Sequence, residues 1–212
     1  MTVRKVVTRR SNHFRGYFPS LKNGKPVPWE SQLEGAFFRL LELSPEVLSY
    51  VAQPSQEYIP FGLSSFTYYP DLRVKLTDGR EWWFEVKPQS RLQVEKVKSR
   101  LDAASRYFAA TGRNFSVVTD GLIQQQPLAR NLQQLMYHRR GPLLLNDKVD
   151  EMSGLLVDHV PKTVSALQEI LGDLQAWRLL GLGIIGIDLN KPLSGDSEIF
   201  HAGGHRHANL FS

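Results

Sequence analysis

Residues 69–87 read YPDLRVKLTDGREWWFEVK, and the alternation within this stretch decides the fold around it. Apolar and polar residues alternate over 72–76 and over 81–84, as they do in strands that bury one face. Between the two runs stands Asp78-Gly79, a dipeptide typical of tight β-turns. The stretch therefore predicts a β-hairpin with an aspartate at its start and a glutamate and a lysine at its end.

The length of the hairpin loop decides which side chains share a face. A two-residue turn would send Asp71 and Glu85 to opposite faces and would break up the apolar face. A three-residue loop that ends in a left-handed Gly79 instead gathers the apolar residues of both strands on one buried face. Burial thus predicts the second register, in which Asp71 lies opposite Glu85 and Lys87 follows on the same face.

The opposed carboxylates indicate a cation site. Directly opposed residues in a hairpin have β-carbons about 4.5 to 5.5 Å apart. Two carboxylates that close repel each other, and one pKa rises unless a cation lies between them. Mg²⁺ or Mn²⁺, hard ions that prefer oxygen ligands, would suit Asp71 and Glu85. The alternative is that Asp71, Arg73, Glu85 and Lys87 form only the solvated face of an ordinary hairpin.

The segments around the hairpin favour the cation site. Residues 28–43 have apolar residues at helical spacing, and Glu34 borders that apolar stripe. Ser31 and Glu34 also form a capping-box pattern, which gives Glu34 a purely structural alternative. Glu30, one turn earlier on the same face, competes with Glu34 as the helix acid. The elements predicted after the hairpin are an amphipathic helix over 92–110 and a strand over 114–119.

Several separately spaced motifs resemble those of the TnsA endonucleases of Tn7-type transposons, which belong to the PD-(D/E)xK nuclease superfamily. The motifs are Trp29-Glu30-Ser31-Gln32-Leu33-Glu34 with Phe37-Phe38, Pro45-Glu46-Val47, Ala52-Gln53-Pro54, Tyr69-Pro70-Asp71 and Phe84-Glu85-Val86-Lys87. The resemblance implies an active site of a helix acid, an aspartate and a Q/E-V-K triplet, which map onto Glu34, Asp71, Glu85 and Lys87. The best-known relative has glutamine where this chain has Glu85, so this chain adds a metal-binding charge.

The resemblance also implies a fold. It predicts an α/β, restriction-endonuclease-like core over 29–120 and a small α+β winged-helix domain over 121–200. The elements that we expect in the second domain are helices over 124–139, 147–159, 163–171 and 173–180, a left-handed cap at Gly181, and strands over 184–189 and 197–201. Since helix 173–180 has only Arg178 as a basic residue, this domain can equally bind protein or DNA.

The implied function is a metal-dependent DNA endonuclease. It would cut the 5′ strands at transposon ends in double-stranded DNA, together with a TnsB-like transposase and a TnsC-like AAA+ ATPase. Two alternatives stay open: a restriction- or resolvase-type endonuclease, and a non-catalytic DNA-binding or assembly subunit. In the implied mechanism Mg²⁺, for which Mn²⁺ would substitute, is held by Asp71, Glu85, the Val86 carbonyl and Glu34. The accessory candidates are Gln53, Arg73 and Gln89.

The charge of the chain is unevenly placed. The formal net charge is +5, yet seven basic residues and no acidic residue precede Glu30. We therefore expect residues 1–28 to form a basic arm that tracks a phosphate backbone, although a solvated, disordered terminus has the same composition. The candidate DNA-binding residues are Arg4, Lys5, Arg9, Arg10, Arg15 and Lys22.

Composition excludes several other classes. The absence of cysteine rules out a disulfide framework and a thiolate zinc site. No long apolar run is present, so we expect neither a membrane span nor a signal peptide, and hence a cytoplasmic, nucleoid-associated bacterial protein. The tail over 201–212 carries three histidines among glycines. Such a tail is typically mobile and unliganded, so we do not expect a metal there.

Overall fold

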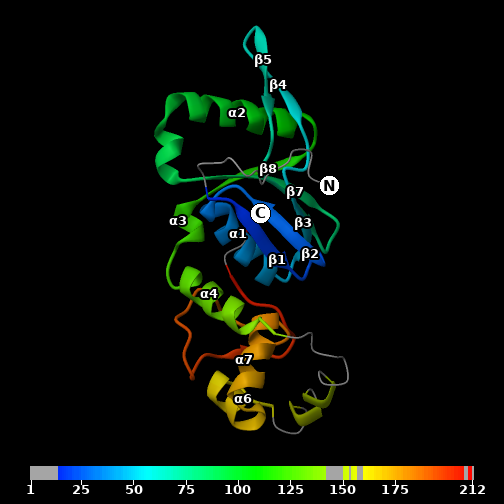
Figure 1. Cartoon of the computed structure of the whole chain (residues 1–212), viewed down its shortest axis with the longest axis vertical. Coiled ribbons are helices and arrows are strands. Elements are labelled where there is room, and N and C mark those ends of the chain that lie inside the picture. Colours follow the sequence, from blue (N-terminus) through cyan, green and yellow to red (C-terminus); the bar gives the residue numbers. More distant parts are fainter. Residues whose placement is uncertain (1–13, 142–149, 153, 157–159, 208–209, 212) are drawn as a thin grey trace. The chain divides into compact units, whose positions relative to one another are not determined.

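The computed structural model describes residues 14–141, 150–152, 154–156, 160–207 and 210–211. These residues form two compact units, which Figure 1 colours along the chain. The first unit holds the described residues through Glu42, residues 46–125 and Phe211, and the second holds 43–45 and the described part of 126–210.

The first unit is built on a mixed four-stranded sheet in the order β3-β6-β7-β8. Strands β3, β6 and β7 pair antiparallel, and β7 pairs with β8 in parallel across the connection made by α2. The elements of this unit are β1 Gly16–Ser20, β2 Lys25–Trp29, α1 Gln32–Leu43, β3 Val47–Ala52, β4 Glu57–Phe61, β5 Ser64–Tyr68, β6 Leu72–Leu76, β7 Glu81–Lys87, the 3₁₀ helix η1 Gln89–Gln93, α2 Glu95–Ala110, β8 Asn114–Thr119 and α3 Asp120–Ile123.

The central hairpin has the predicted register. Leu72 pairs with Phe84 and Val74 with Trp82, and the Leu76 amide donates to the Arg80 carbonyl. Gly79 has φ +89°, the left-handed conformation that closes a three-residue loop. The hairpin prediction is therefore confirmed, because the other register would have moved the apolar residues off the buried face.

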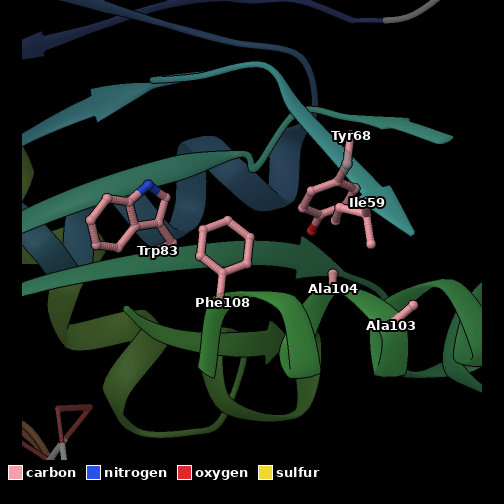
Figure 2. Packing of buried hydrophobic residues seen from close by; sticks show 6 residues of the cluster. All are labelled: Ile59, Tyr68, Trp83, Ala103, Ala104 and Phe108. Atoms are coloured by element: carbon pink, nitrogen blue, oxygen red, sulfur yellow. The ribbon is translucent and has the colours of Figure 1, made fainter. Parts of the chain in front are cut away.

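Both faces of the sheet are buried, whereas the sequence predicted a polar second face. Phe37 of α1 packs on Phe84 with ring centroids 5.4 Å apart, which closes the first face. On the second face Trp83 packs against Phe108 of α2 in an apolar cluster (Figure 2). The α2 connection between the parallel strands β7 and β8 causes this difference, because such connections place a helix on the sheet.

The segment expected to be a basic arm contains a β-hairpin. Strands β1 and β2 pair over residues 16–29. The helix that was predicted from Pro28 onward therefore begins only at Gln32, directly after Ser31. The buried carboxylate of Glu42 fixes the β1–β2 turn, since it accepts from the Leu21 amide at 2.7 Å and from the Ser20 hydroxyl at 2.8 Å. Four arm candidates, Arg4, Lys5, Arg9 and Arg10, lie outside the described residues.

The second unit consists of helices and a very short pair of strands. Its main elements are α4 Leu128–His138, α6 Val164–Leu171, α7 Asp173–Leu182, β9 Gly186–Ile187 and β10 Ile199–Phe200. The helix predicted over 163–171 is confirmed with Thr163 as its cap. Parts of the helix predicted over 147–159 lie outside the described residues. Because β9 and β10 pair over only two residues each, the winged-helix assignment remains a prediction.

The left-handed cap of α7 is Gly183, with φ +72°, and the prediction of Gly181 was wrong. Gly181 lies inside the helix, where a β-carbon would come within 2.8 Å of the Leu135 carbonyl of α4. The glycine at 181 therefore serves close helix packing, and the helix continues past it.

The histidine-rich tail is ordered where it is described, which contradicts the expected mobility. His205 is 2% exposed, accepts from the Ile187 amide at 3.2 Å and contacts the Leu180 carbonyl at 3.0 Å. Because Nδ1 accepts, Nε2 carries the proton and donates to Leu180. Burial lowers the pKa of His205 to about 4, so the ring is neutral and structural.

Phe211 belongs to the first unit although it follows the second along the chain. Its ring packs against Trp82 and Phe84 with centroids 6.2 and 6.0 Å away, and its carbonyl accepts from Arg80 at 3.0 Å. Among the described residues, no helix is long and apolar enough to cross a membrane.

Candidate functional site

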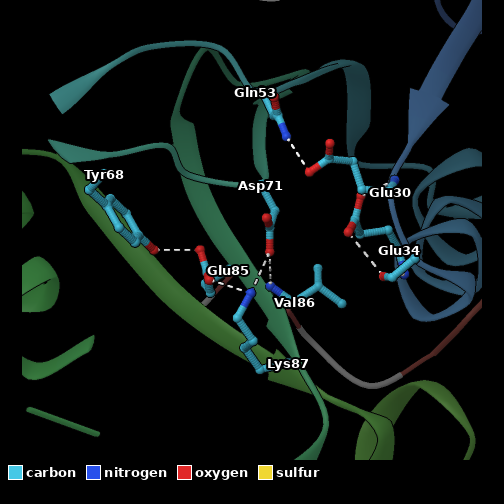
Figure 3. A network of polar contacts seen from close by, with 9 residues as sticks. Glu30, Glu34, Gln53, Tyr68, Asp71, Glu85, Val86 and Lys87 are labelled. Atoms are coloured by element: carbon cyan, nitrogen blue, oxygen red, sulfur yellow. Dashed lines mark hydrogen bonds and ion pairs between the residues drawn. The ribbon is translucent and has the colours of Figure 1, made fainter. Parts of the chain in front are cut away.

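Asp71, Glu85 and Lys87 converge on one side of the central hairpin (Figure 3). Asp71 immediately precedes β6, and the other two residues alternate along β7. The Lys87 ammonium lies 2.6 Å from Glu85 Oε1 and 3.7 Å from Asp71 Oδ2. The Val86 amide donates to Asp71 Oδ2 at 2.8 Å, which fixes that carboxylate against β7. The sequence-predicted trio is therefore one cluster.

This cluster contains more negative than positive charge. Burial, together with the neighbouring Glu85, raises the pKa of Asp71 well above its ordinary value. Burial alone would lower the pKa of Lys87, but the charges of Asp71 and Glu85 outweigh it and raise that pKa. Lys87 is thus a cation at neutral pH, and one ammonium faces two carboxylates.

Tyr68, at the end of β5, is a site residue that sequence reasoning missed. Its buried hydroxyl donates to Glu85 Oε2 at 2.5 Å. Burial and the Glu85 charge raise the pKa of Tyr68, so the phenol stays a donor. Its only signal in the sequence is its place three residues before Asp71, since the contact depends on how β5 folds onto the sheet.

Glu34 and Glu30 have different surroundings. Both Glu34 oxygens are engaged, one by the Ser31 hydroxyl and one by the Glu30 amide, each at 2.9 Å. The Glu34 backbone amide in turn donates to the Ser31 hydroxyl at 3.1 Å, as in a capping box, and burial raises the pKa of Glu34. Glu34 is nevertheless close enough to interact electrostatically with Asp71 and Lys87. Glu30, not Glu34, is among the residues that line the pocket over the cluster.

Gln53 is a strained and incompletely bonded member of the same pocket. Its φ is +44°, the only positive value among the described residues other than glycine, and its side chain is buried. Its backbone amide donates to the Asp71 carbonyl and its Nε2 to Glu30 Oε2, each at 2.9 Å. Its Oε1 is buried without a hydrogen-bond partner. Strain and an unsatisfied amide in one residue are typical of functional positions.

The other candidates lie away from the cluster or contact the protein itself. Arg73 is 3.8 Å from Glu81 on the hairpin surface, and the exposed Gln89 donates its amide to Asp120. Arg15 lies 3.4 Å from Glu30, and the Lys22 ammonium donates to the Val47 carbonyl. The described basic candidates thus take part in internal contacts.

The pocket itself has a volume of about 350 Å³. Besides the acids it is lined by Thr67 and Tyr68 of β5 and by Arg100 of α2. A larger cavity of about 450 Å³ in the second unit has a mainly apolar lining and no comparable pair of opposed carboxylates. The smaller pocket is therefore the candidate functional site.

The donor set suits a hard divalent cation. The described residues hold no cluster of three or more His, Asp or Glu side chains that would by itself form a metal cage. Mg²⁺ does not need such a cage, because it is usually held by one or two carboxylates, with waters and substrate phosphate completing its shell. Asp71 Oδ1 accepts no hydrogen bond among the described residues, and the surplus negative charge beside Lys87 is what a cation would offset.

Comparison with known proteins agrees with this geometry. Residues 44–120 match the family model described as "TnsA-like endonuclease N terminal". The match spans Gln53, Tyr68, Asp71, Glu85 and Lys87, whereas Glu30 and Glu34 precede it. A comparison with curated proteins found no match. The mixed α/β first unit fits a nuclease core, and residues 44–120 are similar to the N-terminal domain of TnsA-like endonucleases.

Proposed function

We propose that the protein is a divalent-metal-dependent endonuclease that cuts the 5′ strands at transposon ends. The observation that supports this most is the convergence of Asp71, Glu85 and Lys87 at the pocket, inside the segment that matches the TnsA-like family. The resemblance supplies the partners: a TnsB-like transposase for the 3′ strands and a TnsC-like ATPase that controls both. The second unit would serve recruitment of these partners.

The surroundings of each side chain indicate its role in this mechanism. Asp71, Glu85 and the Val86 carbonyl would hold Mg²⁺, or Mn²⁺ in its place, with Glu34 nearby to add negative charge. The bound ion would supply positive charge to the scissile phosphate and lower the pKa of a water molecule. Tyr68 holds the Glu85 carboxylate by its hydroxyl, so that Glu85 keeps one orientation.

Lys87 acts as a cation in this mechanism. Because its pKa is raised by Asp71 and Glu85, it stays protonated and is a poor general base. An ammonium in the pocket can instead offset the negative charge that develops on the phosphate in the transition state. This assigns Lys87 to electrostatic stabilisation and leaves proton transfer to another group.

The decisive experiment follows each strand separately. A donor duplex with labelled 5′ and 3′ strands is incubated with the partner transposase and either the wild-type chain, Asp71→Asn or Lys87→Ala. We expect both variants to lose 5′-strand cleavage by a factor of about 10² to 10³, while 3′-strand cleavage continues. Isothermal titration with Mg²⁺ or Mn²⁺ should show weaker binding for Asp71→Asn but not for Lys87→Ala.

Asp78→Asn is the matched control, because it makes the same chemical change on the exposed loop of the same hairpin. It should cut both strands as the wild type does. Excision of the donor at normal rate by Asp71→Asn would place the cleavage in another subunit and leave the hairpin acids as an electrostatic surface. Cleavage of any duplex, without transposon ends or partners, would favour a restriction- or resolvase-type enzyme.

A further inference from the structure

The hairpin β4–β5 is a separate two-stranded sheet that projects from the first unit beyond α2 (Figure 1). Its tip carries large apolar side chains in solvent: Leu63 is 111% exposed and Phe61 is 41% exposed. Gly62 between them has φ +60°, which suits a tight turn. Exposed apolar groups of this size on a projecting element commonly mark an interaction surface.

The base of the hairpin is firmly anchored. Ile59 and Tyr68 pack on Ala103 and Ala104 of α2 in the apolar cluster (Figure 2). Beside them the Arg113 guanidinium binds both Glu57 oxygens, at 2.8 and 3.1 Å, and this pair lowers the pKa of Glu57 to about 2. The projection is therefore a rigid extension of the nuclease unit at its base.

The two faces of the hairpin differ. Glu57 pairs with Tyr68 and Ile59 with Phe66, and these side chains face the protein, as the burial of Glu57, Ile59 and Tyr68 shows. The alternate pairs Tyr58 with Thr67 and Pro60 with Ser65 are exposed. Among the described residues the Ser65 and Thr67 hydroxyls make no hydrogen bond, and residues 58–68 carry no charged side chain. The exposed face is thus uncharged, with free hydroxyls and apolar groups.

The hairpin is also the wall of the pocket. Thr67 and Tyr68, at the end of β5, line the cavity over Asp71 and Glu85. Arg100 lines it too, and its guanidinium lies 4.2 Å from the centre of the Phe66 ring. A phosphate bound in this pocket would therefore lie at the base of the hairpin, and the duplex that carries it would pass beside β5. This adjacency favours DNA over a protein partner as the occupant of the exposed face.

We propose that the exposed face of β4–β5 lies in the major groove of the DNA beside the cut and reads its sequence. This inference rests on the proposed function. The major groove admits a two-stranded β-ribbon, whereas the minor groove is about half as wide. The Ser65 and Thr67 hydroxyls can bond base edges, and Tyr58 on the same face and Leu63 at the tip can contact thymine methyl groups. Arg100 and Lys87 would meet phosphates, which position the duplex without reading it.

The dimensions set where the contact falls. A strand rises about 3.3 Å per residue, and successive phosphates of one DNA strand lie about 3.4 Å apart along the axis. The five residues of β5, Ser64–Tyr68, therefore span about five base pairs. We expect Leu63 to contact bases about five pairs from the scissile phosphate.

Photocrosslinking tests this placement. A photoreactive phenylalanine analogue at Leu63 in the full-length Asp71→Asn chain is irradiated with a labelled transposon-end duplex and the partner transposase. We expect a crosslink to DNA about four to six pairs from the cut. A crosslink only to protein, only to remote DNA, or to nothing overturns the proposal. The same analogue at Leu48, which is 50% exposed on β3, is the control.

Binding by surface variants gives the second measurement. In fluorescence anisotropy with the same duplex, the double variant Tyr58→Ser with Leu63→Ser should bind about tenfold more weakly than the wild type. Replacing thymine by uracil at the contacted pairs should weaken binding by the wild type but not binding by the double variant. Leu48→Ser should bind as the wild type does. If the wild type, the double variant and Leu48→Ser bind equally well and with the same base preference, the inference is wrong, but the proposed endonuclease activity is unaffected. A wild-type protein that never cuts DNA would instead refute the proposed function.

Discussion

Three buried polar side chains of the second unit and the pocket of the first unit are bonded in different ways. In the second unit Asn131 donates to the carbonyls of Leu189 and Lys191, Arg178 donates to those of residues 138, 139 and 141, and His205 bonds to the backbone of Ile187 and Leu180. In the first unit the pocket instead holds two facing carboxylates, one ammonium and an amide oxygen with no partner.

This difference separates architecture from function. A buried polar group whose hydrogen bonds are complete fixes the fold, and its loss should destabilise the protein. A buried group held in repulsion or strain lowers stability, and its loss should leave the fold intact or strengthen it. Four substitutions can break or sharpen this comparison.

The largest effect is expected for Arg178→Met in the second unit. The substitution keeps much of the apolar stem but removes the donors of several buried carbonyls, so the free energy of unfolding should fall by about 3 to 4 kcal/mol. Hydrogen exchange of the backbone amides in α4 and α7, followed over a series of denaturant concentrations, measures this loss of unfolding free energy. Arg130→Met, at an exposed position of α4, should change little. An unchanged Arg178→Met protein would mean that these carbonyls find other donors.

His205 should give the second unit a pH-dependent stability. Burial lowers its pKa to about 4 from 6.5, so the unfolded chain binds a proton at higher pH than the folded one. The stabilisation is complete above pH 6.5 and is lost as the pH falls from 6.5 through 4, by about 3 kcal/mol in total. Exchange of the Ile187 amide between pH 7 and 4 should report it. His201→Gln should keep this slope, and a His205→Gln variant with the same slope would contradict the assignment.

Asp71→Asn should act in the other direction on stability. The asparagine keeps an oxygen for the Val86 amide but removes a buried charge that Glu85 repels, so the metal-free protein should gain about 1 to 2 kcal/mol at pH 7. Thermal unfolding in the presence of a chelator measures the gain, and Mg²⁺ should then stabilise the wild type more than the variant. A clear loss of stability would show that Asp71 is a structural residue like Arg178.

Gln53→Gly should give the smallest effect. Glycine adopts φ +44° without strain and removes the unsatisfied Oε1, so stability should rise by about 1 kcal/mol while cleavage of DNA slows. Gln53→Asn, which also tolerates the left-handed region, separates the two causes because it keeps an amide but withdraws it from Glu30. If Gln53→Gly were destabilised and fully active, Gln53 would be part of the architecture.

The nuclease hairpin could be predicted from the sequence because its register depends on neighbours along the chain. Once Leu72 and Val74 must be buried, the loop and the meeting of Asp71 with Glu85 follow. Tyr68 could not be predicted as a partner of Glu85, since that contact arises from the way β5 packs on the sheet. The second buried face was also missed, because it depends on α2.

The errors in the second unit have a common physical cause. Glycines were interpreted as signs of caps and mobility, but several of them allow close approach of backbones. A β-carbon at Gly186 would lie 1.8 Å from the Gly204 carbonyl oxygen, and one at Gly181 would meet α4. Composition cannot distinguish a flexible glycine from one that another segment packs against. The burial of His205 follows from this packing and has no local signal.

The position of Phe211 affects how the segment 126–210 is attached. This segment follows residue 125 of the first unit, and Phe211 behind it belongs to the first unit again, so both of its ends are joined to that unit. A segment tied at both ends loses less conformational entropy when it assembles than one tied at a single end. Deleting all residues after 120 would therefore also remove the Phe211 ring from its contacts with Trp82 and Phe84. A variant without the second unit should instead join the first unit to Phe211 through a short linker.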